Sequence, residues 1–232
     1  MIEQNRKAFS IFLQFMKARK SYIESLIEQG EHQCQDFKFE ISDSKKIART
    51  LSAFSNTDGG KLLIGVKDNG VPAGVRSDEE FHMLEAAAQM YCQPEVPLSY
   101  AEWQIDGKKI LEVRVEKNRD ALVSAPDKNG EYKVFIRLKD ENILANGMFI
   151  KAWEQKKNGR SVNIQYTEIE KSFIETVQSK QPINFSQLRK SLKVTPQKLN
   201  QLILDFMMID IIELHISEKG YFYCLKEKEE EA

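Results

Sequence analysis

The sequence predicts two α+β domains: a larger one with a mixed β-sheet and flanking helices, and a smaller one of three helices and a β-hairpin. Strand-like and helix-like patterns alternate between residues 35 and 138, which is typical of a sheet covered by helices. A polar segment without apolar periodicity, 156–161, separates this region from the rest. Beyond it, three helical patterns precede a hairpin pattern. The 232 residues suffice for two such domains with buried cores.

The composition is that of an ordinary globular protein and excludes a strongly basic protein that binds nucleic acid through its overall positive charge. Hydrophobic residues make up 41% of the chain and charged residues 30%, and the formal net charge is −1. Histone-like proteins are far more basic. A balanced chain can still bind nucleic acid, because binding requires a local basic patch and not a basic whole.

The cysteines indicate a reducing compartment. Cys34, Cys92 and Cys224 lie far apart, are odd in number and form no CxxC pair. This pattern argues against a disulfide framework and against a structural zinc site. We therefore expect a cytoplasmic protein.

The first twenty residues predict an amphipathic helix. Polar and charged residues interrupt the apolar positions of this segment, so it fits neither a signal peptide nor a membrane span, and no membrane partner is expected. The apolar residues recur at helical spacing: Phe9, Phe12, Leu13 and Met16. We expect this face to pack on the main domain, and a helix that docks a partner stays open as an alternative.

The first half of the larger domain shows a helix, a strand, a second helix and a second strand. Helical spacing continues to Gly30, a natural helix stop. Apolar and polar residues alternate over 35–41, which predicts a half-buried strand. Residues 42–44 supply N-caps for a helix that ends at the turn 57–60. The apolar run 62–66 predicts a strand buried on both faces.

The second half of this domain continues in the same manner. Residues 78–91 suit a helix, and strand patterns follow at 100–104, 110–115 and 133–138. Residues 141–156 predict a helix that ends the domain.

The smaller domain shows the elements of a winged helix, a variant of the helix-turn-helix. Helical patterns cover 167–178 and 185–192, and a third helix follows Thr195 and Pro196. Residues 211–225 predict a β-hairpin. The expected organisation is a first domain at 1–157, a linker at 158–166, a winged helix at 167–226 and a charged tail at 227–232.

Residues 31 to 70 hold the most specific motifs of the chain. They contain the blocks EHQCQDFKFEI and AFSNTDGGKLLIGVKDNG. This stretch resembles the Schlafen AlbA-like domain, whose signature is an acidic-Phe-Lys strand, an AFANT-GG turn, an IGV strand and an acidic turn. The similarity covers about residues 21 to 157 and includes the later strand YKVFIRL. The second half resembles bacterial transcriptional regulators that pair these two modules.

The resemblance also implies a candidate hydrolytic site. In nuclease-active animal Schlafens, a comparable acidic trio binds a divalent metal and cleaves RNA, and the matching residues are Glu31, Asp36 and Asp68. As catalytic and metal-binding residues they would hold Mg²⁺ or Mn²⁺, which activates water and stabilises charge on phosphate. Here Asp36 replaces the usual Glu, and Lys67 stands where an acid is common. We expect instead that Asp36 faces solvent and Asp68 serves a turn, with no cofactor outside the nuclease alternative.

The family has also been described as a divergent ATPase, which this sequence does not favour. Gly59-Gly60-Lys61 lacks the GxxxxGK[ST] loop that wraps phosphates with backbone amides. The glycine pair is better explained as a tight turn before a buried strand.

Two groups of polar residues are candidates for nucleic-acid contact. The first follows the predicted strand 35–41 and could touch phosphates: Lys38, Lys45, Lys46 and Arg49. The second begins the third helix of the winged helix and could meet bases or phosphates: Gln197, Lys198, Asn200 and Gln201. The residues expected to point inward from that helix are Leu199, Leu202, Ile203 and Phe206. An ordinary solvated face is the alternative for both groups.

DNA binding in transcriptional control is the leading hypothesis for function, so the protein is not expected to be an enzyme. A metal-dependent endoribonuclease using the acidic trio is the first alternative, and a protein-interaction adaptor is the second. The expected partner is DNA or RNA, and homo-oligomer formation stays open.

Overall fold

The computed structural model describes residues 21–159, 164–217 and 219–226, which divide into two units between Ile143 and Leu144. The predicted helix at 1–20, the centre of the predicted linker and the charged tail lie outside the described residues. Within the described ranges, no helix is long and apolar enough to cross a membrane.

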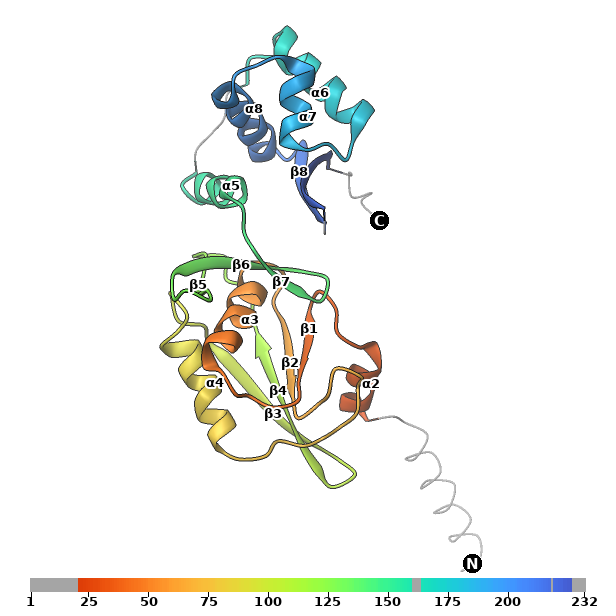
Figure 1. Ribbon diagram of the computed structural model, residues 1–232, viewed down its shortest axis with the longest axis vertical. Coiled ribbons are helices and arrows are strands. Elements are labelled where there is room, and N and C mark those ends of the chain that lie inside the picture. Colours follow the sequence, from red (N-terminus) through yellow and green to blue (C-terminus); the bar gives the residue numbers. More distant parts are fainter. Residues whose placement is uncertain (1–20, 160–163, 218, 227–232) are drawn as a thin grey trace, which may run out of the picture. The chain divides into compact units, whose positions relative to one another are not determined.

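A four-stranded mixed sheet forms the centre of the first unit, which confirms the predicted α+β class (Figure 1). Its strands are β1 (Gln35–Lys38), β2 (Gly60–Ile64), β3 (Leu98–Ile105) and β4 (Lys108–Val115), in the order β1-β2-β4-β3. β1 and β2 are parallel, and the other two pairs are antiparallel.

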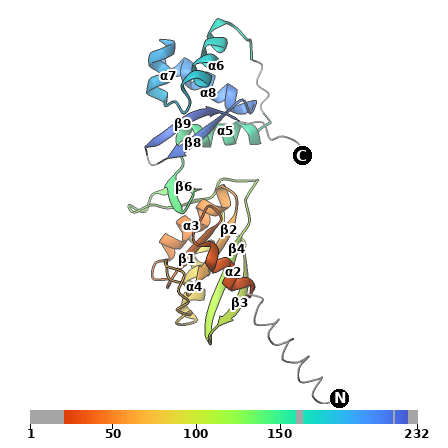
Figure 2. The same ribbon diagram turned by 90° about the vertical axis from the view of Figure 1, so that its right-hand side faces the viewer.

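Helices cover both faces of this sheet, because β2 and β4 carry apolar residues on both sides (Figures 1 and 2). α3 (Ser44–Asn56) and α4 (Glu79–Gln89) pack on one face, where the main core contains Phe54, Leu62 and Val113. α2 (Tyr22–Gln29) packs on the other face against a smaller core that includes Phe37, Leu63 and Ile110.

A three-stranded sheet completes the first unit beside α3. It consists of β5 (Ser124–Pro126), β6 (Tyr132–Leu138) and β7 (Glu141–Leu144) in sequence order. The buried Asn56 side chain at the end of α3 fixes this arrangement. Its Nδ2 donates to the carbonyls of Val123 and Phe135, at 2.7 and 2.8 Å, and its Oδ1 accepts the Val123 N–H at 2.7 Å.

The second unit contains four helices and a two-stranded hairpin within its described residues. The helices are α5 (Gly147–Lys157), α6 (Glu168–Lys180), α7 (Phe185–Leu192) and α8 (Pro196–Met208), and the strands are β8 (Ile212–Ser217) and β9 (Gly220–Leu225). Their core is built from one residue cluster, which includes Phe173, Leu188, Leu199, Ile203, Phe206 and Tyr223. The rings of Phe173 and Phe206 are stacked, with their centres 5.1 Å apart.

The boundary between the units differs from the predicted linker at 158–166. The predicted helix 141–156 is a short strand, β7, followed by α5, which begins where the Asn146 side chain accepts the N–H of Phe149. α5 belongs to the second unit because it packs on α8, and Met148 contacts the core of that unit.

Candidate functional site

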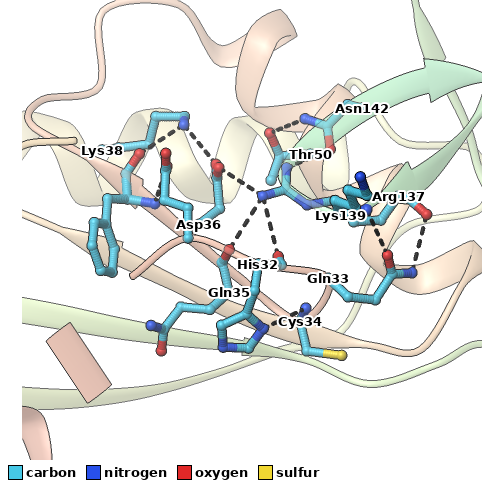
Figure 3. Close-up of polar contacts among 12 residues, drawn as sticks. His32, Gln33, Cys34, Gln35, Asp36, Lys38, Thr50, Arg137, Lys139 and Asn142 are labelled. Carbon is cyan, nitrogen blue, oxygen red and sulfur yellow. Dashed lines mark hydrogen bonds and ion pairs between the residues drawn. The ribbon is translucent and has the colours of Figure 1, made fainter. Parts of the chain in front are cut away.

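Asp36 on β1 is buried, so the expectation that its carboxylate faces solvent is wrong. The side chain is only 5% exposed. Arg137 Nη2 donates to Asp36 Oδ1 at 3.0 Å, and Lys38 Nζ lies 2.6 Å from Oδ2 (Figure 3). Oδ1 therefore accepts a hydrogen bond from Arg137, whereas Oδ2 is ion-paired with Lys38 but accepts no hydrogen bond within the described residues.

Arg137, which the sequence alone did not single out, organises this region from β6. Its side chain is 1% exposed and lies 5.1 Å from the centre of the Phe54 ring. Besides Asp36, its guanidinium donates to the Gln35 carbonyl at 3.2 Å and to Asn142 Oδ1 at 2.9 Å (Figure 3). A charged residue within the apolar run of YKVFIRL was the available signal, because buried arginines are usually paired.

Glu31 lies beside Asp36. Its Oε1 accepts the backbone N–H of Phe37 at 2.8 Å. Burial raises the pKa of the Glu31 carboxyl, and the neighbouring Asp36 carboxylate raises it further, against the lowering effect of the Phe37 N–H. The structure thus brings together two members of the predicted trio.

The third member, Asp68, is exposed in the turn after β2 and does not join them. Across 21–159, 164–217 and 219–226, no three His, Cys, Asp or Glu side chains are grouped so that they could hold a metal ion. Because Asp36 is also committed to Arg137 and Lys38, the residues present do not fit a divalent cation.

The glycine pair before β2 has a packing role. A Cβ atom on Gly60 would lie 2.6 Å from the Phe54 ring, and Gly59 has φ +73° with its Cβ position 2.7 Å from the Val115 carbonyl oxygen. The close approach of α3 to Gly60 and of β4 to Gly59 therefore explains why both positions are glycine, without a phosphate ligand.

The predicted basic residues of the first unit have separate surroundings. Lys38 is paired with Asp36, and Lys45 lies 5.8 Å from the centre of the Tyr91 ring. Arg49 Nε donates to the carbonyl of Lys45 at 3.3 Å, whereas Lys46 is exposed at the start of α3.

The start of α8 has the predicted amphipathic arrangement. Thr195 Oγ1 accepts the N–H of Lys198 at 3.2 Å, and Pro196 occupies the first turn. The four residues expected to point inward are buried: Leu199, Leu202, Ile203 and Phe206. The four predicted contact residues are exposed: Gln197, Lys198, Asn200 and Gln201.

Two of these exposed side chains have partners in their own unit. Lys198 Nζ lies 3.2 Å from Glu170 Oε1 on α6, and Gln201 Nε2 donates to Asp205 Oδ1 at 2.6 Å. Hydrogen bonds from Thr167 and then Lys198 lower the pKa of Glu170 against the effect of burial. Gln197 and Asn200 are thus better placed than Lys198 and Gln201 to contact a ligand.

Comparison with known proteins gives a family for the first unit. The crystal structure of the DIP2311 protein from Corynebacterium diphtheriae matches with a TM-score of 0.43 and 14% sequence identity. The match covers 82% of this chain and 34% of the DIP2311 chain, so this protein spans about a third of the length of DIP2311. The solution structure of the N-terminal domain of a protein related to the ATP-dependent DNA helicase RecG, from Nitrosomonas europaea, matches with a TM-score of 0.33 and 20% identity, over 62% of this chain and 92% of that one. No curated protein matches the chain. Residues 31–146, half of the chain, match the model of the Schlafen AlbA_2 family, and the chain belongs to that family.

Proposed function

We propose that this protein binds nucleic acid, and that its second unit is a winged-helix domain that binds DNA in transcriptional control. The observation that carries the proposal is the start of α8. There, Gln197 and Asn200 are exposed on a helix whose opposite face is fixed in the core. A helix held in this way presents the same side chains to a ligand at every encounter.

The connection between α7 and α8 supports a helix-turn-helix. α7 ends at Leu192, the following residue Lys193 has the left-handed backbone conformation with φ 54°, and α8 starts after Thr195. The turn is short, as in helix pairs that place their second helix in the major groove of DNA.

The hairpin supports the same interpretation. The backbone of Ile183, between α6 and α7, exchanges two hydrogen bonds with Tyr223 of β9, at 3.1 and 2.8 Å. The hairpin of β8 and β9 is thereby fixed to the helices, as a wing that flanks α8 requires.

The chemistry of the exposed side chains fits DNA bases. The carboxamides of Gln197 and Asn200 each offer a donor and an acceptor, the pair needed for two hydrogen bonds to adenine in the major groove. The endoribonuclease alternative has less support, because Asp36 pairs with Arg137 and Lys38, and Asp68 lies elsewhere.

The test begins by selecting preferred duplexes from a random DNA library with the full chain. The variant carrying Gln197→Ala and Asn200→Ala should lose about 10- to 100-fold of its preference for the selected duplex over unrelated DNA. A control with Gln178→Ala and Asn129→Ala, both exposed outside α8, should keep that preference.

Two outcomes would overturn the proposal. Cleavage of RNA with Mn²⁺ that is abolished by Glu31→Ala would make the protein a nuclease. Failure to bind either DNA or RNA at low salt would favour a protein-interaction adaptor.

A further inference from the structure

The charge of the second unit is unevenly distributed along the chain. No Asp or Glu occurs between Glu175 and Asp205, although acidic and basic residues are nearly balanced overall. The same segment covers the end of α6, all of α7 and most of α8. Its cations are Lys180, Arg189, Lys190, Lys193 and Lys198.

Partners within the unit distinguish these five cations. Lys198 is paired with Glu170, and Lys180 Nζ donates to Ser191 Oγ at 3.1 Å. The other three, Arg189, Lys190 and Lys193, are exposed, and none is ion-paired with a carboxylate of the described residues. They are therefore three adjacent positive charges without local neutralisation.

Two open hollows lie along α7 and are lined by these cations. The larger, of about 590 Å³, is lined by Phe185, Ser186, Arg189, Lys190, Lys193 and Val194. The smaller, of about 230 Å³, is lined by Lys180, Ile183, Gln187, Lys190 and Ser191. Lys190 lines both, and neither hollow is lined by a carboxylate.

We propose that α7 and the turn after it bind the phosphate backbone of duplex DNA through Arg189, Lys190 and Lys193. The inference rests on the proposed DNA binding and identifies the phosphate-contacting surface. The two hollows are open and share Lys190. Such a surface suits a polymer with repeated phosphates better than it suits a single small anion, which would need an enclosed pocket. The hydroxyl of Ser186 offers a further donor beside the cations.

This assignment divides the work between two helices. Lys198, the cation first expected to contact DNA, is held by Glu170 on α6. α7 then positions the domain on the backbone without reading sequence, while Gln197 and Asn200 on α8 face the bases.

The experiment measures binding of a labelled duplex by fluorescence anisotropy at several salt concentrations, using the full chain. The test variant carries Arg189→Gln, Lys190→Gln and Lys193→Gln. The control carries Arg119→Gln, Lys128→Gln and Lys151→Gln, which removes the same charge from exposed positions outside this surface. A third variant keeps the charge with Arg189→Lys, Lys190→Arg and Lys193→Arg.

The test variant should lose at least about tenfold in affinity, and the slope of log K against log salt should become shallower by about 2 to 3. The control and the charge-preserving variant should bind like the native chain. An equal loss in test variant and control would show a general charge effect and overturn the inference. Normal binding by the test variant would overturn it while leaving DNA binding intact, whereas a native chain that binds no duplex would remove the proposed function itself.

Discussion

Arg137 connects the two sheets of the first unit at the scale of a single residue. Its guanidinium extends from β6 to the Asp36 carboxylate and the Gln35 carbonyl on β1. Removing water from two opposite charges is costly, so the pair stabilises the fold only because further hydrogen bonds complete it. Asn142 and Gln35 accept such hydrogen bonds from the two Nη atoms, while Arg137 Nε is buried without a hydrogen-bond partner among the described residues (Figure 3).

Asp36→Ala should therefore destabilise the chain strongly, because it leaves the buried Arg137 charge without its carboxylate. We expect a loss of about 3 to 5 kcal/mol in the free energy of unfolding, measured by urea denaturation. Asp68→Ala, at an exposed turn, should change it by less than about 0.5 kcal/mol. Similar losses in the two variants would show that the pair with Arg137 has no special role.

The sequence predicted the candidates of this cluster but not their roles. The family resemblance named Glu31 and Asp36 together, and in the structure these two carboxyls are neighbours. Arg137, the partner of Asp36, lies 101 positions further along the chain, and sequence periodicity holds no information on such a long-range pair. Asp36 was expected to face solvent because the alternation of β1 does not show that β6 and Arg137 cover that side.

At the scale of elements, one buried carboxylate fastens α2 to the sheet. Glu112 of β4 accepts hydrogen bonds from Tyr22 Oη of α2 at 3.0 Å, from Trp103 Nε1 of β3 at 2.9 Å and from Arg114 Nε at 2.7 Å. Burial would raise the pKa of Glu112, but the donors from Arg114, Trp103 and Tyr22 outweigh it and hold the pKa below its usual value.

This shift makes part of the stability depend on pH. A carboxyl with a lowered pKa in the folded state contributes stability above its unfolded pKa of about 4.5, and this contribution is lost as pH falls through the folded pKa. Glu112→Gln should unfold more easily at pH 7 and lose less stability than the native chain between pH 5 and about pH 3. Thermal unfolding across this range measures the difference, and parallel curves for the two proteins would contradict it.

The elements themselves were largely predictable, with one informative exception. Apolar periodicity located α3, α6, α7 and α8, and N-cap residues marked the starts of α3 and α8, because these signals are local. The sequence predicts one helix over 141–156, whereas the first part of this segment pairs with β6 as β7. Strand pairing depends on a neighbour, so a four-residue edge strand leaves little trace in the sequence.

At the scale of the whole molecule, α5 decides where the second unit begins. Lys156 Nζ lies 2.8 Å from Asp210 Oδ1, and Lys226 Nζ approaches the same atom at 3.2 Å. Met148 adds an apolar contact to the core of that unit. The polar composition of 156–161 predicts a linker at that segment. The sequence does not show that α5, most of which precedes this segment, packs on α8 and so belongs to the second unit.

A fragment that starts at Leu144 should therefore be more stable than one that starts at Ile164, although both contain all the predicted winged-helix elements. The longer fragment keeps the contacts of α5 with α8, together with the burial of Ala152 and the ion pair of Lys156 with Asp210, which follows α8. The ion pair is exposed and contributes less than about 1 kcal/mol, so burial of apolar side chains should account for most of the difference. Comparing the thermal unfolding of the two fragments tests this, with Lys156→Gln in the longer one as the control for the ion pair. Equal midpoints would mean that α5 adds nothing to the second unit and would restore the boundary that the sequence alone predicts.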